Sequence, residues 1–247
     1  MRNFTMEVAG RCVGVSAIYE KAEPFCWEYR SNGELDFTVT MNPSDIELEQ
    51  MQSEREARVE GRPAPNHSPA DLEITAIQRK IAEKLMDFDT LLFHGSVVAV
   101  EGECYLFTAK SGTGKSTHTR LWRERLGKRA VMVNDDKPFL HIGADQVIAY
   151  GTPWNGKHHL GENVAVPLKA ICILERGAEN QITPITAKEA LPLLFQQSHR
   201  PQNPRLLGKY LELLDAMTRK ISFYRLRCNM NPEAAVVSYE AMSGKKL

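Results

Sequence analysis

The sequence has few of the features that mark secreted, membrane or nucleic-acid-binding proteins. Only five of its 247 residues are cysteines, and no two of them form a C-x-x-C pair, so neither a disulfide framework nor a zinc site is indicated. The longest apolar runs, such as residues 170–174 (AICIL), are too short to span a bilayer. The N-terminus lacks the apolar stretch of a secretory signal. We therefore expect a cytoplasmic protein with free thiols.

The chain also has no excess of charge. Its 31 basic residues balance 31 acidic residues, which removes the electrostatic case for a nucleic-acid partner or a membrane surface. Hydrophobic residues make up 43% and charged residues 25%, as in an ordinary globular protein. The length allows one sizeable core, with or without a small appended domain.

The N-terminal part is typical of strands. Residues 35–41 (LDFTVTM) alternate apolar and polar side chains, and residues 11–20 are a weaker strand candidate. Residues 42–66 are charged and then rich in Pro and Gly, and within them residues 45–55 could form a short helix or a strand. We expect a β-rich N-terminal region with a linker over residues 1–66 and a catalytic domain over 67–247.

The remainder alternates helices and strands. A helix is predicted from Ser68, a good cap, followed by Pro69 at the first helical position. Two strands with a hairpin between them (96–100 and 104–108) precede a helix over 116–127. The other predicted elements are strands at 130–134, 169–175 and 221–227, helices at 188–197 and 205–217, and a last helix from Asn231.

The most informative stretch lies between the second hairpin strand and its helix. A strand, a glycine-rich turn and a helix N-terminus together form a cradle for phosphate groups. Lys115 is expected to reach the β- and γ-phosphates and Ser116 to complete a Mg²⁺ shell. Ala109 stands where the usual pattern, G-x-x-x-x-G-K-[ST], has its first glycine. An ordinary glycine-rich turn is the alternative. The predicted nucleotide-binding residues are Ser111, Gly112, Thr113, Gly114, Lys115, Ser116 and Thr117.

Two acids end the next apolar strand. Asp135 and Asp136 follow residues 130–134, so their carboxylates are expected at the edge of the sheet beside the glycine-rich turn. One carboxylate can hold Mg²⁺ while the other takes a proton from an attacking hydroxyl. An Asp-Asp turn without any function is the alternative, and the upstream loop favours the functional interpretation.

Further candidates are less specific. His94 opens the hairpin and is expected to be structural unless other residues gather around it. Residues 149–161 hold three glycines, and Trp154, Asn155 and Lys157 in this stretch are candidates to contact a substrate. A surface turn anchored by its tryptophan explains the stretch equally well. Arg176, at the end of a strand, could pair with phosphate or with a neighbouring glutamate.

The combined pattern resembles a known family. "FHG" before a hairpin, then "SGTGKST", then an apolar strand with "DD" is similar to the catalytic domain of HPr kinase/phosphorylase, and more distantly to ATP-dependent phosphoenolpyruvate carboxykinases. "GTPWNGK" and "LERG" look more like the HPr-kinase-related proteins of peptide-modification clusters. The resemblance covers about residues 90–185. It implies an α/β P-loop kinase domain with a mixed central sheet, plus the small β-rich N-terminal region.

The resemblance also implies roles for the matching residues. Lys115 neutralises phosphate, Ser116 and Asp136 bind metal, Asp135 is the general base, and His94 lies beside Asp135 and tunes it. The cofactors are then ATP and Mg²⁺, and the family suggests a homo-oligomer.

The chain departs from the family in three places, the first of which is its N-terminal ninety residues, which do not resemble the N-terminal domain of HPr kinase. Tyr150 precedes "GTPWNGK" at a position where the family has a metal-binding glutamate. The family also carries a catalytic arginine later in the chain, and no single residue here matches it. Three residues could correspond to it: Arg176, Arg200 and Arg205.

These observations favour a kinase that transfers a phosphoryl group from ATP to a hydroxyl of a peptide, a protein or a small metabolite. A nucleotide-gated binding module, which recognises a partner without transferring anything, is the alternative from another class. A carboxykinase is less favoured, because the chain lacks the basic residues expected around two substrate carboxylates.

Overall fold

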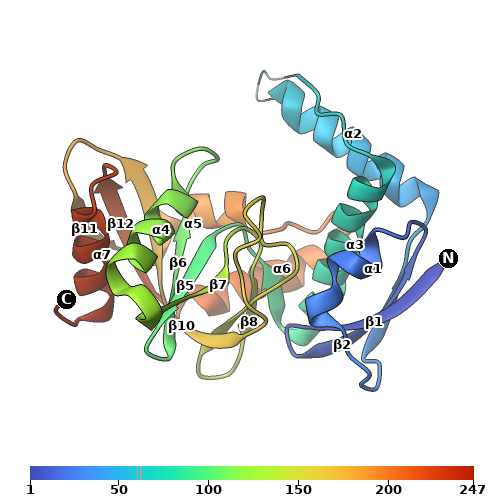
Figure 1. The fold of residues 1–247 in the computed structure, drawn as a ribbon, viewed down its shortest axis with the longest axis horizontal. Helices are drawn as coiled ribbons and strands as arrows, with labels where there is room; N and C mark the ends of the chain where they lie inside the picture. Colours follow the sequence, from blue (N-terminus) through green and yellow to red (C-terminus); the bar gives the residue numbers. More distant parts are fainter. Residues whose placement is uncertain (60, 62) are drawn as a thin grey trace. The chain divides into compact units, whose positions relative to one another are not determined.

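The computed structural model describes residues 1–59, 61 and 63–247 (Figure 1). Their contacts divide into two compact units, Met1–Lys84 and Leu85–Leu247. The boundary expected from the sequence, after residue 66, precedes helix α3 (Pro69–Leu85), whereas the contacts group this helix with the N-terminal unit. Two residues of the expected linker, 60 and 62, lie outside the described residues.

The N-terminal unit contains a three-stranded sheet. Strand β2 (Arg11–Ala17) is central, with β1 (Arg2–Val8) antiparallel to it and β3 (Phe37–Thr40) parallel to it. Both strands expected here are confirmed. The short helices α1 (Ala22–Phe25) and η1 (Trp27–Tyr29) follow β2. Residues 45–55, for which helix and strand were both open, belong to helix α2 (Pro43–Val59).

Buried polar groups hold α3 in this unit. The Glu73 carboxylate is fully buried and accepts hydrogen bonds from the backbone N–H groups of Ile18 (2.5 Å) and Tyr19 (2.9 Å), just after β2. Arg79 forms a buried ion pair with Glu49 of α2 at 2.5 Å. Because a buried charge is costly without its partner, these contacts fix α3 against β2 and α2. The hydrophobic pattern alone could not indicate that α3 packs within the N-terminal unit.

The C-terminal unit is built on a mixed sheet, nine-stranded in the part of the chain that the structure describes. The strands follow the order β4-β8-β9-β10-β6-β5-β7, with β12 also on β10 and β11 on β12. Strands β6, β10 and β12 are parallel, and β5 and β6 form the expected antiparallel hairpin. The strands are β4 (Thr90–Leu92), β5 (Ser96–Val100), β6 (Glu103–Thr108), β7 (Ala130–Asn134), β8 (Phe139–Ile142), β9 (Val147–Tyr150), β10 (Ala165–Arg176), β11 (Gln181–Ile185) and β12 (Ser222–Cys228).

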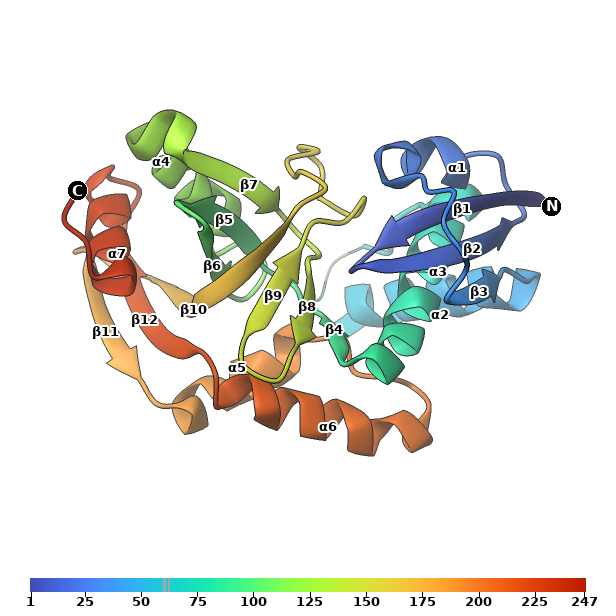
Figure 2. The ribbon, with the colours of Figure 1, turned by 90° about the horizontal axis from the view of Figure 1, so that it is seen from below.

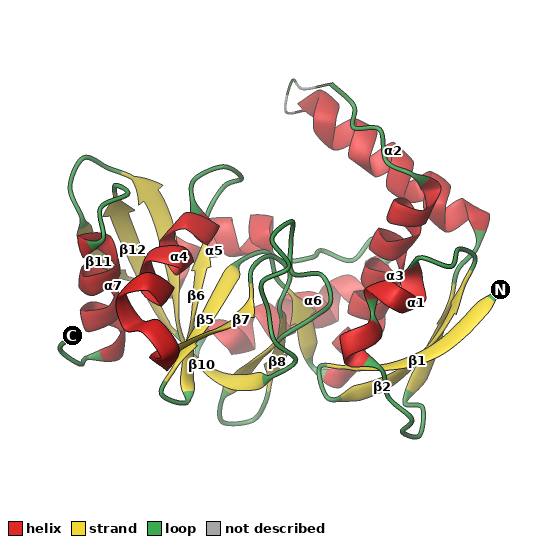
Figure 3. Cartoon of the chain, in the orientation of Figure 1, coloured by secondary structure: helices red, strands yellow, loops and turns green. Residues whose placement is uncertain are grey.

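Helices cover both faces of this sheet (Figures 2 and 3). Cys104 and Leu106 of β6 belong to the core beneath α5 (Ala187–Gln197) and α6 (Pro204–Thr218). Tyr105 and Phe107 belong to the core beneath α4 (Lys115–Leu126) and α7 (Glu233–Ser243). A strand buried on both faces reads as a continuous apolar run, as this one does. Two short 3₁₀ turns, η2 (Met86–Phe88) and η3 (Gly127–Arg129), complete the unit.

The helices begin where local chemistry predicts. Ser68 accepts a hydrogen bond from the Asp71 backbone N–H at 3.2 Å, which confirms the expected cap of α3. Thr186 and Glu189 form a reciprocal capping box at the start of α5. Asn203 caps α6, whose first residue is Pro204. Each cap satisfies backbone N–H groups that a helix cannot pair internally.

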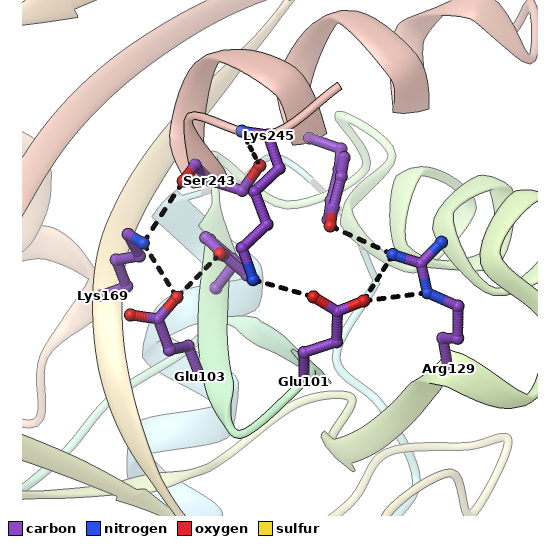
Figure 4. A network of polar contacts seen from close by, with 8 residues as sticks. Glu101, Glu103, Arg129, Lys169, Ser243 and Lys245 are labelled. Carbon is purple, nitrogen blue, oxygen red and sulfur yellow. Dashed lines mark hydrogen bonds and ion pairs between the residues drawn. The ribbon is translucent and has the colours of Figure 1, made fainter. Parts of the chain in front are cut away.

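A polar network joins the β5–β6 turn to the C-terminal end of α7 (Figure 4). Glu101, in the turn, accepts from Arg129 (2.6 Å) and Lys245 (2.8 Å). Glu103, at the start of β6, pairs with Lys169 of β10 at 2.8 Å. These side chains are partly exposed, so each pair contributes little stability by itself. The network lies at the opposite end of β6 from the glycine-rich loop.

The cysteines of this protein are not paired with one another. All five cysteines are free thiols, and all but Cys228 are buried. Across the described ranges, no helix combines the length and the apolar character needed to cross a membrane.

His118 links α4 to α7 inside the protein. It is 3% exposed, and its Nε2 lies 3.0 Å from Ser238 Oγ, which also accepts from Trp122 Nε1 at 2.8 Å. Burial lowers the pKa of His118 from 6.5 to about 4, because the charged imidazolium loses its hydration there.

We expect His118 to make the protein acid-sensitive. Below pH 6.5 the unfolded chain binds a proton here that the folded protein does not bind until about pH 4, so stability is lost as the pH falls through this window. At about pH 4.5 the loss is ~2–3 kcal/mol. Urea denaturation near neutral pH and near pH 4.5 measures it. His118→Gln should lose less stability on acidification than wild type, and equal losses would contradict the assignment.

Candidate functional site

The glycine-rich loop, residues 109–114, joins β6 to α4. Gly112 (φ 74°) and Gly114 (φ 119°) adopt the left-handed backbone conformation that favours glycine, and a Cβ on Gly112 would meet nothing within 4 Å. Ala109 keeps a negative φ and is 1% exposed within the core beneath α4. Alanine fits there because the position needs a small buried side chain and no left-handed backbone.

The loop ends at a helix N-terminus. Gly114 is the N-cap of α4 and has no side chain with which to cap the first N–H groups, so these point into the space beside the loop. Such an end carries about half a positive charge and suits an anion. Ser116 and Thr117 lie in the first turn and are partly exposed, whereas Ser111 and Gly112 are exposed.

Lys115 opens the helix and is half-buried. Its Nζ lies 3.5 Å from the Ala109 carbonyl oxygen, across the mouth of the loop. Burial lowers the pKa of this ammonium, while the negative charges of Asp136 and Asp135 act to raise it. The charges of both predicted acids therefore act on the charge of this lysine.

Asn134, the last residue of β7, fixes the turn that carries the two acids. Its fully buried side chain accepts from the backbone N–H groups of Asp136 (2.9 Å) and Lys137 (2.6 Å). Its amide donates to the carbonyl (3.1 Å) and hydroxyl (3.0 Å) oxygens of Thr152. The Thr152 hydroxyl in turn donates to the Lys137 carbonyl at 2.8 Å. All polar atoms of this amide are used, so the turn is held rigidly.

Asp135 points into the protein. It is 6% exposed, and its Oδ1 accepts from the Ser96 hydroxyl at 2.6 Å. Ser96 Oγ also lies 2.9 Å from Thr119 Oγ1, on the second turn of α4. This chain of hydroxyls links the carboxylate to the helix that begins with Lys115 and Ser116.

Asp136 lies in a different environment. Its Oδ1 is 3.2 Å from His94 Nε2 and 3.9 Å from Lys137 Nζ, and about a third of its side chain is exposed. Burial acts to raise the pKa of Asp136, but the hydrogen bond from His94 and the charges of Lys137, His94 and Lys115 outweigh it, so the pKa is lowered. The carboxylate is therefore ionised at neutral pH.

His94 contacts Asp136, and the expectation that it lies beside Asp135 needs correction. The side chains of Asp135 and Asp136, neighbours in the turn after β7, point in different directions, and Asp135 turns toward Ser96. Gly95 donates its backbone N–H to the Asp136 carbonyl at 3.0 Å, which brings His94 to that side. Burial lowers the pKa of His94 below 6.5, so the imidazole is neutral at pH 7.

The loop over residues 151–161 packs against this turn. A Cβ on Gly151 would lie 1.9 Å from the Glu162 carbonyl oxygen, and one on Gly156 would lie 3.2 Å from Asp136 Cβ, so both positions require close approach. Trp154 is buried, and its carbonyl accepts from the Lys137 N–H at 3.2 Å.

The four predicted substrate-binding residues do not gather at one point. Trp154 and Asn155 are buried beside the acidic turn, and the Asn155 Oδ1 is a buried acceptor with no hydrogen-bond partner. Lys157 is exposed on the same loop. Arg176 lies at the end of β10, where its guanidinium donates to the Gly112 carbonyl at 2.7 Å. The structure thus places Arg176 against the glycine-rich loop and on another strand than the acids.

The donor set fits Mg²⁺ only together with phosphate groups. Among the described residues there is no cluster of three or more His, Cys, Asp or Glu side chains that could hold a metal alone. Mg²⁺ is commonly held by one or two carboxylates plus substrate phosphates. Asp135, linked by Ser96 and Thr119 to the helix of Ser116, offers such a carboxylate.

Sequence reasoning missed the residues that support the acids. Asn134 carried a usable signal, since an Asn before a turn often accepts from backbone N–H groups two and three residues on. Ser96, Thr119 and Thr152 carried none, because their roles depend on which strands and helices become neighbours.

Comparisons with known proteins add a distant structural likeness. No protein-family model matches the chain, and no curated protein matches it by sequence. Among solved structures, the HPr(Ser) kinase/phosphatase from Coxiella burnetii is similar, with a TM-score of 0.37 and 9% sequence identity. That match covers 62% of this chain and 97% of that chain. The roles of individual residues consequently rest on the geometry of this site.

Proposed function

We propose that the protein is an ATP- and Mg²⁺-dependent kinase that transfers the terminal phosphoryl group to a hydroxyl. One observation carries the proposal: a glycine-capped helix N-terminus opens with a lysine on whose charge both aspartates act, and a buried asparagine holds the turn that carries these aspartates. An anion cradle beside a fixed proton acceptor is the minimum that phosphoryl transfer requires of a protein.

The glycine-rich loop binds the phosphates of ATP. Backbone N–H groups of residues 112–116 and the Lys115 ammonium neutralise negative charge, and the left-handed glycines leave room for close approach. Ser116 and Asp135 hold Mg²⁺ together with the phosphates. Bound Mg²⁺ adds electrostatic stabilisation of the charge on the transferred group.

The two aspartates divide the chemistry. The family resemblance implies that Asp135 is the general base and that Asp136 binds metal, whereas the contacts favour the reverse. Asp136 is partly exposed and ionised, and His94 orients it, so it can accept the proton of an incoming hydroxyl. Asp135 is buried against Ser96 on the side of α4, which suits it to the metal.

The acceptor is a hydroxyl of a peptide, a protein or a small metabolite. It approaches Asp136 beside the 151–161 loop, where Asn155 offers a buried acceptor atom and Lys157 an exposed cation. A nucleotide-gated binding module is the alternative. The His94–Asp136 pair argues against it, because a protein that only binds ATP does not need an oriented carboxylate beside the phosphates.

Single substitutions should distinguish the roles of the residues in this site. We expect Lys115→Ala to lower kcat/KM by about 100-fold or more, because a preorganised charge on the transferred phosphoryl group is lost. Asp136→Asn should lower kcat by about 10²–10⁴-fold at saturating Mg²⁺. Asp135→Asn should instead raise the Mg²⁺ concentration needed for half-maximal rate. Mass spectrometry of a pool of serine and threonine peptides and hydroxylated metabolites, incubated with Mg-ATP, detects the product.

The control for these variants is the exposed pair Arg120–Glu124 on α4. Arg120→Ala should retain the wild-type rate, since its side chain lies in solvent. The opposite pattern for the two aspartates would restore the roles that the resemblance implies. Tight ATP binding with no product from any acceptor would support the binding module instead.

His94 provides a separate test of the carboxylate pair. Since the hydrogen bond from His94 to Asp136 raises the pKa of the histidine against the effect of burial, Asp136→Asn should lower that pKa further. Asp135→Asn, which leaves this contact in place, should move it less. Titration of the imidazole by NMR measures both. If the pKa rises or stays unchanged in Asp136→Asn, the contact does not exist in solution.

A further inference from the structure

The carboxylate of Asp135 has one oxygen that the protein holds and one that is open. Its Oδ1 accepts the Ser96 hydroxyl at 2.6 Å, a distance typical of a hydroxyl that donates to a carboxylate. Its Oδ2 accepts no hydrogen bond from the described residues, yet it is not enclosed by protein. Asp135 therefore presents a single oxygen, Oδ2, to a ligand.

The hydroxyl of Ser96 has a defined direction. Ser96 begins β5 and is fully buried. A hydroxyl carries one proton, whereas a carboxylate can only accept, so the Ser96 proton points to Asp135. Ser96 Oγ also lies 2.9 Å from Thr119 Oγ1, and the proton of that contact must then come from Thr119. The two hydroxyls consequently donate in one direction, from α4 toward the carboxylate.

Thr119 joins this chain to the first turn of α4. It is 1% exposed, and its Oγ1 lies 3.4 Å from the Lys115 carbonyl oxygen and 3.3 Å from that of Ser116. Both distances exceed the range of about 2.5–3.0 Å usual for a hydroxyl donor, whereas the 2.9 Å to Ser96 falls within it. The Thr119 proton therefore favours Ser96, which keeps the chain of two hydroxyls intact.

The two proposed ligands of Mg²⁺ need such a connection. Ser116 lies on α4 and Asp135 follows β7, so no short segment of backbone fixes the distance between them. The last torsion of an aspartate side chain is broad, and an unrestrained carboxylate could offer either oxygen. In metal sites, groups that hydrogen-bond to the ligands orient them and strengthen metal binding.

From these contacts we infer that Ser96 and Thr119 are positioning residues for Mg²⁺, which hold Asp135 so that Oδ2 faces the metal and tie it to the helix of Ser116. The inference rests on the proposed function, because it takes Mg²⁺ binding by Asp135 and Ser116 as given. Neither hydroxyl touches the metal or the reacting atoms, and each acts through the carboxylate.

Calorimetric titration of Mg²⁺ tests this without turnover. Protein in excess keeps a non-hydrolysable ATP analogue, β,γ-imido-ATP, bound, so the titration measures the metal affinity of the complex. We expect Ser96→Ala to raise the Mg²⁺ dissociation constant about tenfold or more. Its affinity for the analogue in EDTA, without metal, should stay unchanged, because the glycine-rich loop is intact.

Ser198→Ala is the matched control for this variant. It removes another buried hydroxyl of the C-terminal unit, one that bonds to the Leu194 carbonyl and the Tyr210 hydroxyl. It should change neither the metal affinity nor the affinity for the analogue.

Thr119 provides a second pair of variants. Thr119→Val keeps the shape of the side chain and removes the hydroxyl, whereas Thr119→Ser keeps the hydroxyl and removes a methyl group. If the hydroxyl positions Asp135, Thr119→Val raises the Mg²⁺ dissociation constant and Thr119→Ser leaves it near the wild-type value. A role in packing alone would give the reverse order.

The outcomes separate this inference from the proposed function. Unchanged or tighter Mg²⁺ binding by Ser96→Ala would overturn the positioning role while leaving the nucleotide site intact. If the wild type does not bind the analogue, or its complex does not bind Mg²⁺, the proposed function fails and the inference fails with it. Loss of metal-free analogue binding in Ser96→Ala would reveal misfolding, and the order of the two Thr119 variants then decides.

Discussion

The buried amide of Asn134 is the interaction on which the candidate site depends. It donates twice to Thr152 and accepts twice from the turn that follows β7, so each of its polar atoms is paired inside the protein. A carboxylate of the same shape could not donate, and an apolar side chain would leave four backbone and hydroxyl groups without this partner. The amide thereby joins a strand end to a distant loop and sets the direction of each acid.

Two neighbouring aspartates acquire different chemistry from this one turn. Asp135 enters the protein and meets a hydroxyl, whereas Asp136 remains partly in solvent beside an imidazole and a lysine. Their covalent structure is identical, so the difference arises wholly from which neighbours the strand order supplies. The backbone of the turn therefore decides the surroundings of each carboxylate. Those surroundings suit Asp135 to the proposed metal and Asp136 to the proposed acceptor.

Local patterns predicted much of this molecule. The hairpin of β5 and β6, helix α4 and strand β7 follow from periodicity and turn chemistry, and Lys115 opens α4 while Asp135 and Asp136 follow β7 as the sequence pattern indicates. Strands β8, β9 and β11 were not predicted, because strands of four or five residues depend on their partners more than on their own sequence. The contact of His94 with Asp136 and that of Arg176 with Gly112 were likewise unpredictable, since each depends on the register between strands far apart in the chain.

Ala109 has a consequence for how such loops are recognised. The letter pattern asks for glycine at this place, yet the backbone here is ordinary and only the two later glycines have positive φ. A motif written in backbone angles would demand glycine twice and accept any small residue at the start of the loop. Sequence searches that insist on the first glycine of the pattern will therefore pass over chains whose loops have the same shape.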